Sequence, residues 1–360
     1  MQDKLKNIVT QFNTQGEFVK GVAYGCGHIN DTYLIETDTK KYILQRINHN
    51  VFKNVDGLMS NIVGVTEHIK TRLQKDGKDT TNALSVIYTL DGKPYYFDGE
   101  NYYRLYNFIT DGVSIETRAT KEEFYLSAVG FGRFQKLLDG YPSENLWDTI
   151  VDFHNTRRRF ENFKIAMSEN KAMRLDSVQE EVKFFLDRER YTGIVVDMLK
   201  SGELPTRVTH NDTKLNNVLI DINAKRASSV IDLDTVMAGS LLYDFGDSIR
   251  SGATTAAEDE IDLSKVNFDI ELFEAYTKGF VEEVGERLTE KEIEYLAFGA
   301  ILMTFECGMR FLTDYLNGDT YFKIKREHHN LDRARTQIKL VKDMEKRLDE
   351  MNDIVKRYLK

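Results

Sequence analysis

Residues 210–217 read HNDTKLNN and are followed, after an apolar segment, by an Asp-Leu-Asp triplet that begins at Asp232. Asp212 and Asn217 flank one short loop. The apolar residues that follow Asn217 and precede Asp232 predict a β-hairpin that returns the chain to this loop. The hairpin would bring Asp232 beside Asp212 and Asn217, so that two carboxylates and an amide converge. Such groups can take a hydroxyl proton and hold magnesium against phosphates.

The spacing of His210, Asp212 and Asn217 reproduces the H-R-D-x-x-x-x-N catalytic loop of protein kinases. Each residue alone would be read as an ordinary turn or strand-end residue, but their order and the strands between them predict a phosphoryl-transfer loop. We expect Asp212 to be the catalytic base, and Asn217 and Asp232 to bind the metal. Asp234 is expected to be either a second metal ligand or a hydrogen-bond acceptor within the loop.

Two further residues are expected to support the loop and not to touch a substrate. His210 is predicted to buttress it from behind. Asp244, in the run LYDFGD at 242–247, is predicted to open a helix and to accept hydrogen bonds from the loop backbone.

A glycine-rich segment, Gly25-Cys26-Gly27-His28, lies between two predicted strands. Gly-x-Gly in a hairpin is commonly a simple turn. Its position ahead of a third strand favours a phosphate-binding loop, in which Gly25 and Gly27 let the backbone approach the nucleotide. It is no dinucleotide fingerprint, because a strand and not a helix follows it.

The next strand, at 41–47, has no lysine where protein kinases place a phosphate-binding one. Alternation puts Ile43, Gln45 and Ile47 on one face, which favours Gln45 as the equivalent residue; Arg46 would supply the charge if the register differs. Glu67, on the following helix, is expected to be solvated.

An aromatic run at 102–109 falls where two lobes would join, and is expected to offer backbone groups and apolar walls to adenine. Tyr106 and Phe108 are the expected nucleotide contacts, while most of the other aromatic residues of the run belong to the core.

The chain organisation predicts an α+β, protein-kinase-like bilobal fold: a small β-rich N-lobe with one helix, then a larger, mostly helical C-lobe with an embedded β-hairpin. The expected domains are 1–109, which includes a hinge near 106–109, and 110–360. Expected strands are at 18–24, 31–36, 41–47, 84–90, 95–98, 217–221 and 228–232, and expected helices at 56–73, 121–138, 177–200, 269–284, 289–316 and 332–359.

Composition excludes several other classes of protein. The formal net charge of -9 over 360 residues disfavours nucleic-acid binding, which depends on neutralising phosphates. Two cysteines, Cys26 and Cys307, cannot form a disulfide framework and favour a reducing compartment. No signal region or long uncharged apolar stretch is apparent, so we expect a cytoplasmic protein without a membrane partner.

Several strings resemble the bacterial N-acetylhexosamine 1-kinases, within the aminoglycoside phosphotransferase and choline kinase-like superfamily. They are THNDTKLNNVL, VIDLDTVMAGSLLYDFGDSIRSGATTAAEDE, GCGHINDTYLIET, YILQRIN, ECGMRFLTDYLNGDTYF and RTQIKLV, which together span nearly the whole chain. The glutamine in YILQ is also typical of that subfamily.

The resemblance implies ATP- and Mg2+-dependent phosphorylation of the anomeric hydroxyl of N-acetylglucosamine or N-acetylgalactosamine, in a cytoplasmic enzyme that we expect to be a monomer. It suggests sugar contacts for Asp212, His28, Arg310 and Tyr321. From the residues alone, Arg310 forms an exposed pair with Glu306 or faces a cleft, and Tyr321 stacks on a sugar or packs. The alternatives are a choline, aminoglycoside, homoserine or methylthioribose kinase of the same fold, or a regulatory pseudokinase.

Overall fold

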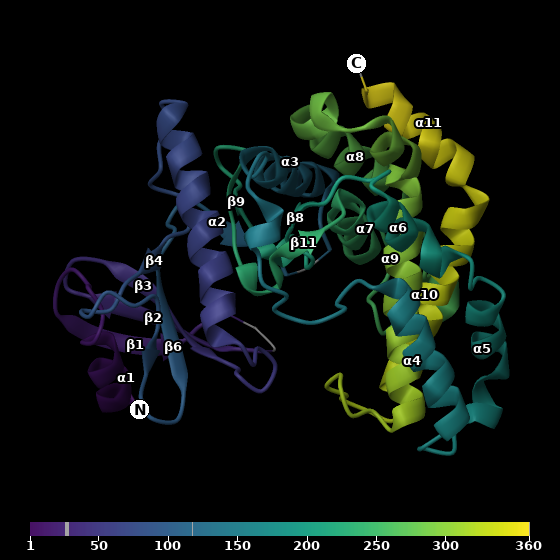
Figure 1. Ribbon diagram of the computed structural model, residues 1–360, viewed down its shortest axis with the longest axis horizontal. Coiled ribbons are helices and arrows are strands. Elements are labelled where there is room, and N and C mark those ends of the chain that lie inside the picture. Colours follow the sequence, from purple (N-terminus) through teal and green to yellow (C-terminus); the bar gives the residue numbers. More distant parts are fainter. Residues whose placement is uncertain (26–28, 117, 360) are drawn as a thin grey trace.

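The protein is described by a computed structural model that covers residues 1–25, 29–116 and 118–359 and has two lobes (Figure 1). The smaller lobe holds an antiparallel sheet, and the larger lobe is mostly helical with short strands on the side that faces the first. The predicted α+β bilobal, kinase-like fold is confirmed.

The N-lobe sheet has the strand order β1-β2-β3-β6-β4, with β5 also paired to β6, and every pairing is antiparallel. Its strands are β1 (Phe18–Ala23), β2 (Asp31–Thr37), β3 (Lys41–Ile47), β4 (Val86–Ile87), β5 (Tyr96–Phe97) and β6 (Tyr102–Asn107). The predicted strand at 84–90 shrinks to two residues, because Thr89 and the residues beyond it turn to bond with Lys93.

Each face of this sheet is covered by a helix, so the expectation of one helix in the N-lobe is wrong. α2 (Val55–Lys75) packs on the face that carries Ile43 and Ile47. α1 (Gln2–Val9) covers the opposite face, where Leu5, Ile8 and Val9 join a core with Tyr42 and Leu44. The amphipathic N-terminus is therefore a structural element, because the sheet needs apolar cover on both sides.

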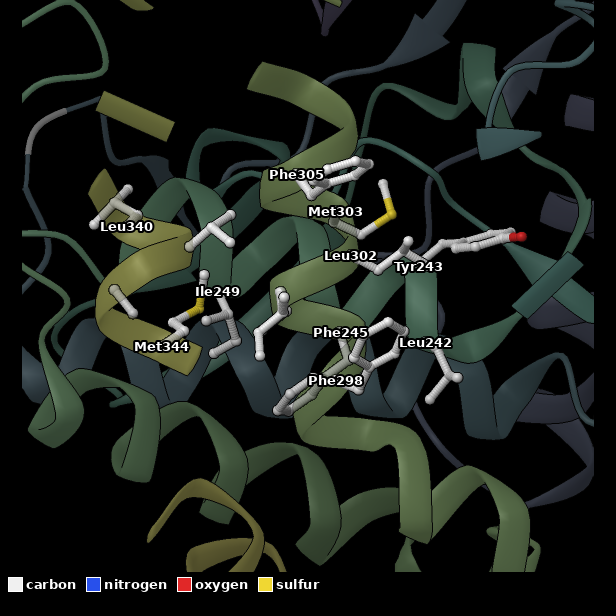
Figure 2. Packing of buried hydrophobic residues seen from close by; sticks show 14 of the residues in the cluster. Leu242, Tyr243, Phe245, Ile249, Phe298, Leu302, Met303, Phe305, Leu340 and Met344 are labelled. Carbon is white, nitrogen blue, oxygen red and sulfur yellow. The ribbon is translucent and has the colours of Figure 1, made fainter. Parts of the chain in front are cut away.

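The C-lobe is built around two buried helices, α7 (Leu241–Gly252) and α9 (Glu290–Asn317), which cross in its core. Figure 2 shows Phe245 and Ile249 of α7 packed with Leu302 and Met303 of α9, and Leu340 and Met344 of a further helix close by. The remaining helices are α3 (Lys121–Leu137), α4 (Thr156–Glu169), α5 (Gln179–Leu186), α6 (Tyr191–Ser201), α8 (Ile270–Val284), α10 (His329–Lys346) and α11 (Leu348–Tyr358).

Three helix predictions need correction. α4 was not predicted, because its first turns carry three arginines in a row and its apolar face is narrow; the Asn155 side chain caps it by accepting from the Arg158 N–H at 3.1 Å. The expected helix at 177–200 is divided at Asp187–Arg190 into α5 and α6. The expected final helix is divided at Arg347, whose backbone leaves the helical region with φ -112° and ψ 11°.

By length and composition alone, α9 could cross a membrane, with a mean hydropathy of 1.3 over its most apolar window. That window is 83% buried inside the C-lobe, as expected of a core helix. The final helices α10 and α11 pack on α8 and α9 of their own lobe, as the apolar faces of their sequences require.

Short strands at the front of the C-lobe position the candidate site. β8 (Arg207–Thr209) pairs with β11 (Met237–Gly239), and the hairpin of β9 (Val218–Asp221) and β10 (Arg226–Val230) is the one predicted. β7 (Val113–Ser114) pairs with β9 and carries the chain into the C-lobe. The loop after β8 and the segment after β10 therefore end side by side.

Candidate active site

The loop between β8 and β9 brings Asp212 and Asn217 into direct contact. The Asn217 amide nitrogen donates to the Asp212 backbone oxygen at 2.8 Å and to its carboxylate at 3.1 Å. The loop turns sharply at Asn211, which has φ +65°, and Asp232 at the end of the hairpin has φ +60°. These left-handed conformations are uncommon outside glycine and indicate a backbone fixed by its surroundings.

The carboxylate of Asp244 supplies much of that fixation. Its oxygens accept from the backbone N–H groups of His210 at 2.9 Å and Asn211 at 2.7 Å, and from the side chain of Gln135 at 2.6 Å. The predicted backbone contact is confirmed. The helix itself is capped by Ser240, so Asp244 lies in its first turn and does not open it.

His210 has the predicted buttressing position. Its side chain is fully buried, its Nε2 lies 2.9 Å from the Ile231 carbonyl oxygen, and its ring meets the edges of two phenylalanine rings, Phe131 and Phe134. It therefore joins the catalytic loop to the end of β10, beside Asp232.

Asp212 is half-buried and its carboxylate lies 2.7 Å from the ammonium group of Lys214. Burial opposes ionisation, but Lys214, with His210 and Arg250 further off, lowers the pKa of Asp212 below its ordinary value. The carboxylate is therefore ionised near neutral pH and able to accept a hydrogen bond from a hydroxyl group.

Asp232 differs from Asp212 in its charge environment. Its side chain remains accessible to water, yet desolvation by the surrounding protein and the charges of Asp234 and Asp212 raise its pKa to about 7. A cation bound beside Asp232 would offset the neighbouring negative charges and favour the ionised form of its carboxylate.

The donor set fits Mg2+. The Asn217 nitrogen is committed to Asp212, which leaves its amide oxygen for another partner, and Asp232 supplies a carboxylate. No three His, Cys, Asp or Glu side chains gather into a complete metal site within residues 1–25, 29–116 and 118–359. Magnesium does not require one, since it is commonly held by one or two protein oxygens together with substrate phosphates.

Asp234 is engaged by the N-lobe. It forms an ion pair with the buried Arg104 of β6, and its other oxygen accepts from the Asn30 side chain at 2.5 Å. The acceptor role that was expected within the loop is thus directed to N-lobe residues instead, and these contacts tie the two lobes together.

Arg104 was missed by the sequence reasoning. Gln45 does lie on the predicted face of β3, directly opposite Arg104, whose guanidinium donates to the Gln45 oxygen at 2.8 and 3.0 Å. The Gln45 nitrogen donates to Thr32. A buried positive charge therefore lies beside Gln45 on the neighbouring strand, where it is paired with Asp234. The sequence feature that could have identified Arg104 is its position as a single arginine in an aromatic strand. A charged residue buried in such a strand requires a partner, which would have pointed to a contact like that with Asp234.

Arg46 is not brought to this group. It lies on the opposite face of β3, 40% exposed, and donates to Asp31 at 2.8 Å and Asn101 at 3.1 Å. Glu67 is exposed on α2, as expected.

The expected nucleotide contacts are divided between core and surface. Tyr106 is buried beneath the Arg104 guanidinium, 5.3 Å from its ring, so it packs in the core. Phe108 is half-buried, and its ring meets that of Tyr24 at a centroid distance of 6.1 Å. Gly25 adopts φ +73°, which favours glycine. Gly27 and His28 lie outside the described residues.

Arg310 and Tyr321 lie together on the other side of the catalytic loop. The Arg310 guanidinium is 5.3 to 5.9 Å from the rings of Phe153, Phe322 and Tyr321, and it lines a pocket of about 330 Å3 between α4, α9 and the loop that follows α9. Of the two alternatives for Arg310, the exposed pair with Glu306 does not form. Arg310 faces the pocket instead, and Tyr321 is 62% exposed at its edge.

Glu306 has another partner, which links α9 to the catalytic loop. This buried carboxylate lies 2.8 Å from His154 Nδ1 and accepts from Thr156 at 2.6 Å. The other ring nitrogen of His154 lies 3.2 Å from the Asn211 carbonyl oxygen. Arg310 lies one helical turn after Glu306 on α9. Through Glu306 and His154, this helix is therefore connected to Asn211, the residue that precedes Asp212.

Solved structures with this architecture are kinases and phosphotransferases that act on small molecules. Spectinomycin phosphotransferase, in complex with ADP and spectinomycin, has a TM-score of 0.60 at 13% identity, with 96% of this chain and 97% of that chain covered. The microcompartment-associated aminopropanol kinase has a TM-score of 0.59 at 13% identity, with 99% of each chain covered. Choline kinase from Cryptosporidium parvum has 0.58 at 13% identity, with 99% and 98% covered. At these identities, the similarity defines the class of fold.

The family follows from the sequence itself. Residues 21–279, more than half of the chain, match the phosphotransferase enzyme family. The chain belongs to this family.

Proposed function

We propose that the protein is an ATP- and Mg2+-dependent kinase that phosphorylates the anomeric hydroxyl of N-acetylhexosamines and releases the sugar 1-phosphate. The observation that carries the kinase part is the meeting of Asp212, Asn217 and Asp232 at the end of the hairpin. The choice of sugar is supported by the resemblance of the six strings that run from GCGHINDTYLIET to RTQIKLV.

In this mechanism, the sugar lies with its anomeric hydroxyl against Asp212. The ionised carboxylate orients the hydroxyl and accepts its proton as the sugar oxygen bonds to the γ-phosphorus of ATP, while the bond from that phosphorus to the β–γ bridging oxygen breaks and ADP leaves. Mg2+, held by Asn217 and Asp232, would neutralise charge on the ATP phosphates. Lys214 keeps Asp212 ionised, and Asp244 and His210 hold the loop that carries it.

Arg310 and Tyr321 are proposed to bind the sugar. A guanidinium group with free N–H donors suits hydroxyl and acetamido oxygens, and an exposed tyrosine ring offers a stacking surface. We further propose a monomeric cytoplasmic enzyme without nucleic-acid or membrane partners, in keeping with the acidic composition.

The test is a coupled assay of ATP consumption by the purified protein over a panel of sugars and amines, with the position of the new phosphate assigned by 31P NMR. We expect turnover with N-acetylglucosamine or N-acetylgalactosamine, and phosphate on the anomeric oxygen. Phosphorylation of choline, an aminoglycoside, homoserine or methylthioribose in place of the hexosamines would overturn the choice of substrate. ATP consumption that no acceptor stimulates would favour a regulatory protein.

A further inference from the structure

The pocket between α4 and α9 is unusual in its charge. Two half-buried arginines, Arg159 of α4 and Arg310 of α9, line it. Their guanidinium carbons lie 6.0 and 5.3 Å from the centre of the same ring, that of Phe153, so the two positive charges are close neighbours.

Neither arginine has an ionic partner within the part of the chain that the structure describes. Arg159 donates only to the backbone oxygen of Phe153, at 3.0 and 3.2 Å. Arg310 makes ring contacts but no hydrogen bond or ion pair with a described residue. Most of the donor capacity of two guanidinium groups is therefore left for solvent or a ligand.

The nearby carboxylates are already committed. Asp314 accepts from three consecutive backbone N–H groups at 320–322 and from the Asn330 side chain, all between 2.8 and 2.9 Å. Glu306 is bonded to His154 and Thr156. Glu169, at the pocket edge, pairs with Lys171 at 3.0 Å. Among its described lining residues, the pocket carries the positive charges of Arg159, Arg310 and Lys171 against the negative charges of Glu169 and Asp314, and neither arginine forms an ion pair with these two carboxylates.

This arrangement is costly for the protein alone. Burial, followed by repulsion from Arg310, lowers the pKa of Arg159 below its ordinary value. Two like charges beside a cavity of about 330 Å3 are the arrangement that a ligand anion would stabilise, because a carboxylate or phosphate accepts from both guanidinium groups at once.

We propose that this pocket is an anion-binding extension of the acceptor site, in which Arg159 and Arg310 together hold a carboxylate or phosphate group of the acceptor. The contacts from Glu306 through His154 to Asn211 connect α9, which carries Arg310, to the loop that carries Asp212, so the two arginines and Asp212 belong to different parts of the site. The anion therefore belongs to the end of the acceptor that is remote from the phosphorylated hydroxyl. Neutral acceptors would leave this part of the site filled with water.

The inference rests on the proposed hexosamine kinase activity, and it is tested by acceptor preference. KM is measured for three acceptors. They are an N-acetylhexosamine, the corresponding N-succinylhexosamine, and the 6-phosphate of the N-acetylhexosamine. We expect at least one charged acceptor to have a KM about tenfold lower than the neutral sugar, a factor that corresponds to about 1.4 kcal/mol.

Arg159→Gln should reduce this preference to about twofold or less, while Arg159→Lys, which keeps the charge, should retain most of it. Arg158→Gln is the matched control, since Arg158 is an exposed neighbour on the same helix and does not line the pocket. The proposal is overturned if neither charged acceptor is preferred by the wild-type protein, or if Arg159→Gln and Arg158→Gln behave alike. A comparison of the KM values for the succinyl and phosphate acceptors shows whether the pocket prefers a carboxylate or a phosphate.

A second measurement keeps the anion site testable if no hexosamine is phosphorylated. Thermal unfolding is followed with sodium sulfate or sodium chloride at equal ionic strength. Because sulfate also stabilises folded proteins in general, the site predicts a larger rise in Tm over the chloride value for the wild-type protein and for Arg158→Gln than for Arg159→Gln. Equal sulfate effects on all three proteins would rule out the site independently of the substrate.

Discussion

The loop that carries Asp212 and the pocket between α4 and α9 are connected by the contact between Glu306 and His154. They differ in how far their polar groups are hydrogen-bonded within the protein. In the loop, backbone and side-chain groups around Asp212 are bonded to Asp244, Asn217 and Lys214. In the pocket, Arg310 has open N–H groups. The difference indicates that the protein fixes the geometry of phosphoryl transfer by itself, whereas the pocket is completed by what binds to it.

The largest effect is expected from Asp212→Asn, which removes the ionised carboxylate but keeps the shape of the side chain. Turnover should fall by about a thousandfold or more, because the hydroxyl loses its proton acceptor. Nucleotide affinity, measured by calorimetry, should change little. Asp221→Asn, at the far end of the same hairpin, is the control and should keep wild-type turnover. Equal activity in the two variants would remove Asp212 from the mechanism.

A large effect on stability is expected from Asp244→Asn. An asparagine has one side-chain oxygen that accepts, where the aspartate has two. At least one of the buried donors, which are the N–H groups of His210 and Asn211 and the side chain of Gln135, therefore loses its acceptor. The free energy of unfolding should fall by about 2–3 kcal/mol in denaturant titrations. Asp349→Asn, in the first turn of α11, provides the exposed control. A loss below that of the control would mean that the loop does not depend on Asp244.

A smaller and pH-dependent effect is expected from Asp232→Asn. With a pKa of about 7 in the folded protein against an ordinary value of 3.8, Asp232 binds a proton more readily when folded. Its contribution to stability is therefore most favourable at low pH and is lost as the pH rises towards 7. The variant should have a higher Tm than the wild-type protein above pH 7, and this advantage should vanish near pH 4. A constant difference across that range would contradict the crowding of carboxylates.

The smallest effect is expected from Tyr321→Ala at the edge of the pocket. The side chain is 62% exposed and its ring only meets Arg310 and Phe322, so its loss should raise the acceptor KM by about fivefold and change kcat by less than about twofold. Steady-state kinetics with the best acceptor measures both. A fall in kcat without a change in KM would show that the pocket is not separate from the chemistry.

The sequence predicted the parts of the site that are local in the chain. Asp212 and Asn217 are five residues apart, and one short hairpin returns the chain to them at Asp232, so spacing was sufficient. The contact of Asp244 with the loop backbone was also predicted, although Asp244 lies in the first turn of α7 and not ahead of the helix.

The contacts between lobes could not be predicted in the same way. Arg104 reaches Asp234 only because β6 pairs with β3 in one register and because the lobes meet face to face. Neither condition can be read from the spacing of residues that are close together in the sequence. The division of the last helix at Arg347 is likewise set by packing on α8 and α9, since the amphipathic pattern continues across it.

A crystal structure with Mg2+ and a non-hydrolysable ATP analogue would show whether Asp212, Asn217 and Asp232 meet the metal and the phosphates. We expect a metal about 2.1 Å from the Asn217 amide oxygen and from an Asp232 oxygen, with the terminal phosphate facing Asp212. A nucleotide whose terminal phosphate is bound elsewhere, with these three side chains free, would contradict this expectation.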